Sequence, residues 1–150
     1  MTIEIQNFTA RKIDENFLEK IIHTTIQFEK KQKDDKIYMS VALVGVGRME
    51  SLNRRYHKEK RATDVLSFSG GKDFMVPKRF GKYLGEIILC PKVIQKQALR
   101  TKVAFEKEFA HVLVHGTLHL LGWEHERSDA AAVKMHTMEE KMLKELGVMN

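Results

Sequence analysis

The stretch "HVLVHGTLHLLGWEH", residues 111–125, begins with His111 and carries three further histidines, His115, His119 and His125, among mostly apolar side chains. His115 and His119 are four positions apart, so on a helix both imidazoles lie on one face, with Cβ atoms about 5–6 Å apart. Gly122 allows the chain to turn, and His125 can then approach the same point. Three neutral imidazoles favour Zn²⁺ and leave its fourth position for water, as in catalytic zinc sites. The spacing therefore predicts one zinc ion held by these three histidines.

The same spacing occurs in metzincin proteases, whose pattern H-E-x-x-H-x-x-G-x-x-H includes a glutamate that serves as general base. In this chain Gly116 occupies the glutamate position. A peptidase of that type loses its base when the glutamate is missing. The sequence thus favours the metal site and argues against proteolysis.

Outward from this stretch, the sequence predicts an α/β (α+β) fold in which a small mixed four-stranded sheet packs with helices. The expected strands are residues 2–7, 37–46, 64–69 and 83–90. The expected helices are residues 14–33 behind a cap at Asp14, residues 47–57, a long helix from Pro91 to about Leu121, and a last helix capped by Ser128. Phe28 and Val133 are assigned to the apolar faces of the first and last helices. The zinc site would lie on the long helix after the last strand.

Length and composition predict one domain spanning residues 1–150, since 150 residues with 43% apolar side chains suffice for one core. No apolar run approaches the roughly 20 residues of a membrane span, and the start "MTIEIQNFTARK" lacks the order of a signal peptide. We therefore expect a cytoplasmic protein without membrane contact. The single cysteine, Cys90, has no internal disulfide partner and is expected to be buried.

The net charge of +6 is concentrated in one segment. Residues 54–82 hold nine basic side chains against three acidic ones, so the remaining residues sum to zero. Such a segment is typical of a surface that meets a polyanion such as RNA, although a solvated basic loop has the same composition. The residues expected to contact RNA are Arg54, Arg55, Lys58, Lys60, Arg61, Lys78 and Arg79.

Three stretches carry motifs: "HGTLHLLGWEH" (115–125), "LNRRYHKEKRATDVLSF" (52–68) and "LGEIILC" (84–90). They resemble the signatures H-G-x-L-H-L-x-G-[YF]-D-H, L-N-x-x-[YF]-R-x-K-D-x-P-T-D-V-L-S-F and L-G-D-I-x-I of the YbeY-type endoribonucleases. The resemblance implies a zinc-dependent endoribonuclease, specific for single-stranded RNA, that matures the 3′ end of small-subunit rRNA during ribosome biogenesis. It also implies contacts with the small ribosomal subunit and its assembly factors.

The chain departs from these family motifs at several positions. His57 stands where the family usually has arginine, and Ala62 where it usually has proline. Arg55 or Arg61 could supply the missing cation, because imidazole does not reproduce the bidentate grip of a guanidinium on phosphate. Two aspartates of the motifs are replaced by glutamates, which keep the carboxylate and lengthen its reach. The candidate catalytic residues are Glu124, His57, Arg55 and Glu86.

The expected chemistry is attack on a phosphodiester by water that a bound zinc ion has made acidic, with the general acid and base unassigned. Two other classes remain open. A non-catalytic ribosome-assembly factor would bind RNA around a structural zinc ion, and a metal-dependent hydrolase would act on another substrate. Turnover by metal-loaded protein distinguishes the first alternative, and the salt dependence of RNA binding distinguishes the second.

Overall fold

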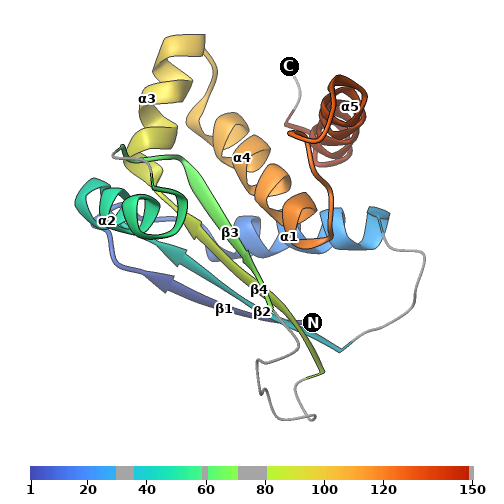
Figure 1. The fold of residues 1–150 in the computed structure, drawn as a ribbon, viewed down its shortest axis with the longest axis horizontal. Coiled ribbons are helices and arrows are strands. Elements are labelled where there is room, and N and C mark those ends of the chain that lie inside the picture. Colours follow the sequence, from blue (N-terminus) through green and yellow to red (C-terminus); the bar gives the residue numbers. More distant parts are fainter. Residues whose placement is uncertain (30–35, 59–60, 71–80, 149–150) are drawn as a thin grey trace.

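Strands and helices alternate at the start of the chain, and helices follow one another toward its end (Figure 1). The computed structural model describes residues 1–29, 36–58, 61–70 and 81–148. The strands are β1 (Thr2–Asn7), β2 (Ile37–Leu43), β3 (Val65–Ser69) and β4 (Lys82–Leu89). The helices are α1 (Glu15–Glu29), α2 (Val46–His57), α3 (Pro91–Thr101), α4 (Phe105–Leu120) and α5 (Asp129–Glu145).

The four strands form one mixed sheet in the order β1-β2-β4-β3. The pairs β1–β2 and β2–β4 are parallel, whereas β3 pairs with β4 in the antiparallel direction and lies at the edge. This arrangement confirms the predicted α/β class and its small mixed sheet. The metal-site helix, α4, follows the last strand, as predicted.

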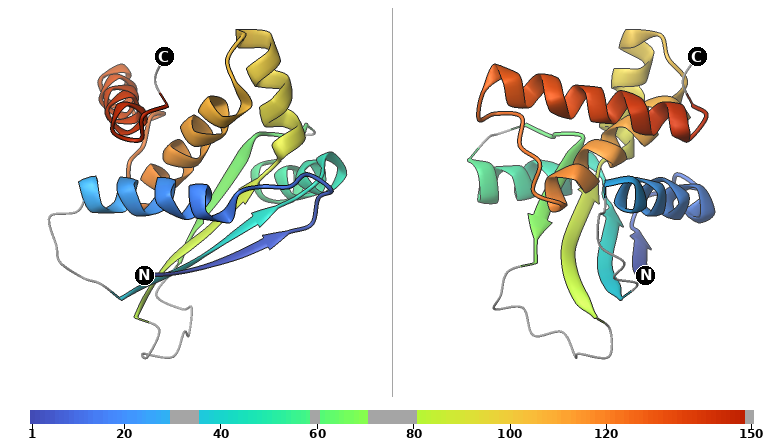
Figure 2. Two further views of the ribbon diagram at one scale, coloured as in Figure 1. Left: turned by 180° about the vertical axis from the view of Figure 1, so that it is seen from behind. Right: turned by 90° about the vertical axis from the view of Figure 1, so that its right-hand side faces the viewer.

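Alternating side chains of the sheet face two separate apolar clusters, because successive residues of a strand point to opposite faces. Val41 and Ile87 belong to a large core that α1, α4 and α5 complete, and Figure 2 shows these helices on one side of the sheet. Leu66 and Ile88 belong to a smaller cluster that includes Met49 of α2 and the fully buried Cys90. The predicted burial of the cysteine is thereby confirmed.

Side chains at the predicted positions start two of the helices. The carboxylate of Asp14 accepts hydrogen bonds from the backbone N–H groups of Asn16 and Phe17, at 3.0 and 3.2 Å. The hydroxyl of Ser128 accepts one from the N–H of Ala131 at 3.0 Å. These bonds satisfy N–H groups that a helix start leaves without partners.

Two side chains assigned to apolar faces are exposed instead. Phe28 is 49% exposed and Val133 is 65% exposed, so both assignments are wrong. Each lies two positions from a fully buried residue, Ile26 or Met135 respectively. Two residues correspond to about 200° around an α-helix, which places Phe28 and Val133 on the solvent side. Of the helix predicted for residues 14–33, positions 30–33 lie outside the described residues.

The single long helix predicted from Pro91 to about Leu121 is also wrong, because it divides into α3 and α4. Lys102 takes a left-handed conformation with φ 57°, which few residues other than glycine adopt, and Ala104 is extended before α4 begins. No glycine or proline in "RTKVAFEKE" (100–108) marks this break. The break lets α4 cross the sheet over β3 and β4 independently of α3.

None of the helices in the described part of the chain combines the length and the apolar character that crossing a bilayer requires.

Candidate metal centre and its pocket

The three predicted metal ligands come together at the end of α4. His115 and His119 lie on adjacent turns of the helix, with ring centroids 4.5 Å apart, and His125 follows from the turn after it. One nitrogen of each ring lies within 4.8 Å of the corresponding nitrogens of the other two. Three imidazoles at this separation are able to bind one metal ion.

A backbone carbonyl sets the proton position on His119. Its Nδ1 lies 2.8 Å from the carbonyl oxygen of Trp123, and a carbonyl only accepts hydrogen bonds. The Nδ1 atom therefore carries the proton, and Nε2 keeps its lone pair. Burial, followed by the neighbouring His115, lowers the pKa of His119, which favours this neutral form.

Gly122 positions the carbonyl that His119 uses. With φ at 97°, it takes the left-handed conformation that ends a helix. Its N–H bonds to the carbonyl of His119, and the N–H of Trp123 bonds to the carbonyl of Leu118, both at 3.0 Å. This pattern is a Schellman motif, and it turns the chain back so that His125 reaches the other two histidines.

A buried carboxylate from α5 sets the proton position on His115. The Nδ1 atom of His115 lies 2.8 Å from Oε2 of Glu139, and the other oxygen lies 3.4 Å from Nε2 of His111. Although burial raises the pKa of Glu139, the bonds to both histidines lower it to about 2. The ionised carboxylate accepts a hydrogen bond from the N–H at Nδ1, so the proton of His115 stays on Nδ1 and its lone pair is on Nε2.

These two assignments leave lone pairs facing each other. The Nε2 atoms of His115 and His119 are 2.9 Å apart, and in the neutral tautomers set by Glu139 and Trp123 neither carries a proton. The buried Nδ1 of His125 has no hydrogen-bond partner within the described residues. Two lone pairs therefore face each other beside a third imidazole, and a cation between the three rings would relieve the repulsion of those lone pairs. This donor set fits a metal ion.

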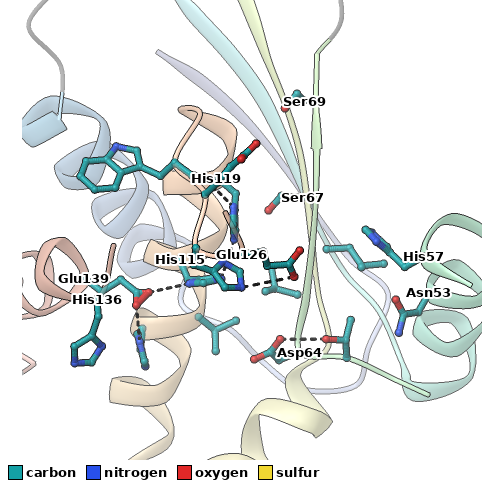
Figure 3. A pocket seen from close by; sticks show the side chains of 18 of the residues that line it. Asn53, His57, Asp64, Ser67, Ser69, His115, His119, Glu126, His136 and Glu139 are labelled. Atoms are coloured by element: carbon teal, nitrogen blue, oxygen red, sulfur yellow. Dashed lines mark hydrogen bonds and ion pairs between the residues drawn. The ribbon is translucent and has the colours of Figure 1, made fainter. Parts of the chain in front are cut away.

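A pocket of about 970 Å³ surrounds the histidines and extends across the edge strand β3 (Figure 3). Asn53 and His57 approach it from α2, on the other side of β3 from His115 and His119. Six of the seven histidines in the chain line this pocket, namely His57, His111, His115, His119, His125 and His136. Imidazole is thus concentrated at one place on the protein.

The charged lining of the pocket is mainly acidic. Its carboxylates are Asp64, Glu108, Glu124, Glu126 and Glu139. Among the described residues that line the pocket, Arg61 supplies the one guanidinium. An anionic substrate therefore needs positive charge from a bound metal ion and from the basic end of α2, where Arg54, Arg55 and Lys58 are exposed.

The structure brings some of the predicted catalytic and RNA-contact residues to the pocket. His57, Arg61 and Glu124 line it, and Glu124 lies 3.8 Å from the Nε atom of Arg127. Arg55 lies outside the described lining, with its guanidinium 5.5 Å from the ring centre of Tyr56. Lys60, Lys78 and Arg79 lie outside the described residues.

Glu86 is not among the described residues that line the pocket. It follows the buried core residue Gly85 on β4 and precedes Ile87, which faces α4. Strand alternation directs Glu86 to the opposite face, where its carboxylate accepts a hydrogen bond from the hydroxyl of Ser40 at 3.1 Å.

Gly116 lies where α4 packs directly on β3. A Cβ atom at this position would lie 3.1 Å from Cγ2 of Val65 and 3.2 Å from Oγ of Ser67. The hydroxyl of Ser67 also donates to the Gly116 carbonyl at 3.1 Å. A glutamate side chain does not fit in this contact. The absence of the metzincin base thus follows from the packing of the helix on the sheet.

Two residues of the pocket lining, Glu139 and Asn53, are not among the site residues predicted from the sequence. Glu139 is 5% exposed and lies on the buried face of α5 with Met135 and Met142, so a carboxylate within an apolar stripe was the available signal. Asn53 is 3% exposed, and its side-chain amide donates to the carbonyl of Arg61 at 2.8 Å. That hydrogen bond links the segment before β3 to α2. No residue spacing in the sequence indicates this contact.

Known proteins resemble this chain along most of its length. A family model described as "Endoribonuclease YbeY" matches residues 3–147. A protein named endoribonuclease YbeY from Acinetobacter baumannii (strain ACICU) is 37% identical over 134 residues, which cover 89% of this chain and 84% of that protein. A namesake from Thermodesulfovibrio yellowstonii is 40% identical over 111 residues, which cover 73% and 67%. The solution structure of TM1509 from Thermotoga maritima matches with a TM-score of 0.62 and 29% identity, covering 97% of this chain and 89% of that one.

Proposed function

The chain belongs to the endoribonuclease YbeY family, and on that premise we propose that it is a zinc-dependent endoribonuclease that cleaves single-stranded RNA. Its substrate in this proposal is precursor rRNA, and its product is the mature 3′ end of the small-subunit rRNA. It works in the cytoplasm, in contact with the small ribosomal subunit and its assembly factors.

One observation carries the metal part of this proposal. The Nε2 atoms of His115 and His119 face each other at 2.9 Å with their protons held on the opposite ring nitrogens. His125 adds a buried nitrogen that has no hydrogen-bond partner among the residues that the structure describes. Zinc accepts three imidazole nitrogens and retains a fourth position, as catalytic zinc sites do. A zinc ion bound there supplies Lewis acidity and lowers the pKa of water toward neutrality.

Basic residues of the chain bind the RNA in this proposal. Arg61, which lines the pocket, binds a phosphate of the RNA, because a guanidinium forms paired hydrogen bonds with phosphate oxygens. Arg54, Arg55 and Lys58 at the end of α2 hold the strand outside the pocket by attraction to its backbone. These contacts do not depend on base sequence.

Three groups in the pocket are placed to move protons. His57 approaches from α2 and Glu124 from the turn that carries His125. The hydrogen bond that His111 donates to Glu139 raises the pKa of His111, so this ring keeps its proton at higher pH than an ordinary histidine does. We assign His57 or Glu124 as the base and His111 as a proton donor, and Glu86, on the opposite face of the sheet, has no role in this assignment.

The test is to incubate zinc-loaded protein with precursor rRNA and map the new ends. Hydrolysis by water that releases the 3′ oxygen leaves a 5′-phosphate on the downstream fragment. Attack by the 2′-hydroxyl of the RNA instead leaves a 2′,3′-cyclic phosphate and a 5′-hydroxyl. We expect 5′-phosphate ends within unpaired RNA, and we expect none from His119→Ala protein. Cyclic-phosphate ends that persist after zinc is chelated would contradict this mechanism.

A further inference from the structure

We infer that Glu139 is a positioning residue of the metal centre: it holds His115 in the tautomer that presents Nε2 to the ion, and it joins α5 to the centre. This inference rests on the metal site of the proposed function. Glu139 lies 14 positions beyond His125, on a helix that contributes no metal ligand in the described structure.

The position of Glu139 within α5 is unfavourable unless the carboxylate is paired. It lies on the buried side of the helix with Met135, Met142 and Leu143, and only 5% of the residue is exposed. Burying an unpaired carboxylate is strongly unfavourable, whereas a carboxylate with hydrogen-bond donors is tolerated. The donors here are two histidines of α4, so the docking of α5 depends on the ring positions of those histidines.

The two oxygens of Glu139 have separate partners. Oε2 lies 2.8 Å from Nδ1 of His115, and Oε1 lies 3.4 Å from Nε2 of His111. His111 and His115 are four residues apart on α4, and the carboxylate spans them. Figure 3 shows Glu139 beside His115. The shorter contact is the one to the metal ligand, and it involves the ring nitrogen on the side away from the other ligands.

Removing this carboxylate leaves the Nδ1 proton of His115 without its acceptor. The ring is then free to place its proton on Nε2, which blocks that atom as a ligand, or to rotate away. Partners of ligating histidines are generally worth about 10- to 100-fold in metal affinity. Because coupling between two parts of a protein is reciprocal, zinc should also stabilise the docking of α5.

Three variants test the role of Glu139. Glu139→Leu removes the acceptor and matches the apolar surroundings, whereas Glu139→Gln keeps a carbonyl that still accepts the proton of His115. Glu140→Gln is the matched control, since it removes one charge at the next position, where the carboxylate faces His136 instead. Competition for Zn²⁺ against a chromophoric chelator measures the affinity of each folded protein. We expect a loss of 10- to 100-fold for the leucine variant, a smaller loss for Glu139→Gln, and a change within twofold for the control.

Two further readouts separate positioning from a general loss of structure. In metal-free wild-type protein, NMR of the ring nitrogens should show the proton of His115 on Nδ1, and Glu139→Leu should move it toward Nε2. Hydrogen exchange should show that Zn²⁺ slows the amides of α5 in wild-type protein and does so less in the leucine variant. If Glu139→Leu does not fold, Glu139→Gln decides the question by its zinc affinity.

Equal zinc affinities for wild-type, Glu139→Gln and any folded Glu139→Leu protein would overturn the inference, as would an unchanged tautomer of His115. Failure of the wild-type protein to bind Zn²⁺ would instead overturn the proposed function, and the tautomer measurement would still decide whether Glu139 orients His115. RNA is absent from all of these measurements, so a failure to cleave rRNA does not affect their outcome.

Discussion

The three histidines of the centre differ in the hydrogen bonds that their rings form. His119 donates to a carbonyl in its own turn, His115 donates to a carboxylate from another helix, and the buried Nδ1 of His125 has no partner within the described residues. Neutral imidazole with its proton on the outer nitrogen is a metal ligand, whereas the same ring protonated on the inner nitrogen is not. Small hydrogen-bonding changes around these rings should therefore have large effects on metal binding.

We expect His119→Ala to abolish tight zinc binding, because two imidazoles cannot complete the site. The measurement is the zinc content of purified protein after dialysis, with about one ion per molecule expected for wild type. His23→Ala is the matched control, since His23 is exposed on α1 and lies outside the pocket. Full zinc occupancy in the His119→Ala protein would show that the triad is not the binding site.

The hydrogen bond between His111 and Glu139 predicts how the stability of the metal-free protein depends on pH. The pKa of Glu139 falls from 4.5 to about 2 on folding. Its contribution to the free energy of unfolding is therefore complete above pH 4.5 and is lost as the pH falls toward 2. The pKa of His111 is raised from 6.5, so its contribution is complete below 6.5 and is lost as the pH rises through the raised value. Urea unfolding of metal-free wild-type and Glu139→Gln proteins should therefore differ most between pH 4.5 and 6.5. A difference independent of pH would contradict this pairing.

The C-terminal turns of α4 and α5 are similar, but only the turn after α4 contributes to the candidate metal centre. Both helices are followed by a glycine with positive φ, namely Gly122 at 97° and Gly147 at 72°. A Cβ atom at either position would meet nothing within 4 Å, so an alanine there causes backbone strain without a clash. Of these two turns, the one at Gly122 carries a carbonyl that accepts a hydrogen bond from His119, a residue of the candidate metal centre.

Gly122→Ala and Gly147→Ala should therefore cost similar stability, about 1 kcal/mol each in the free energy of unfolding. Zinc affinity should fall only in Gly122→Ala, because strain there displaces the Trp123 carbonyl from His119. Urea denaturation and chelator competition on both variants check this. Equal zinc affinities in the two proteins would mean that the turn does not orient the ligand.

At the scale of the whole molecule, the pocket around the three histidines and the exposed basic side chains at the end of α2 are separate features, and β3 joins the two regions. The three histidines of the candidate metal centre lie on α4 and its following turn, while the exposed arginines lie at the end of α2. The pocket itself is lined by several carboxylates. We therefore expect the strength of RNA binding to depend mainly on the basic end of α2, and metal binding to depend on α4 and the turn after it.

Charge reversal of Arg54, Arg55 and Arg61 should weaken binding of single-stranded RNA and flatten its dependence on salt. The slope of log K against log salt should become shallower by about 2, because each phosphate contact contributes about 0.7. Reversal of Lys141 and Lys144, which are exposed on α5, is the control and should have little effect. Equal losses from the two sets would mean that charge in the segment around α2 does not mark the RNA surface.

The sequence by itself determined the features that depend on short spacings. The separation of His115 and His119 places them on adjacent helical turns, and Gly122 supplies the turn that returns His125, because both effects are local. Alternation and helical periodicity likewise predicted the four strands and the α/β class. These properties arise within a few residues and need no information about distant segments.

Only the tertiary structure decided which distant side chains join the centre. It placed Glu139 against His115 and directed Glu86 to the other face of the sheet. It also divided the long helix at Lys102. The register of a strand and the packing angle of a helix result from contacts across the whole core, so no local pattern encodes them. The physical reason is that a side chain's neighbours are set by how α4, α5 and the sheet bury their apolar faces together.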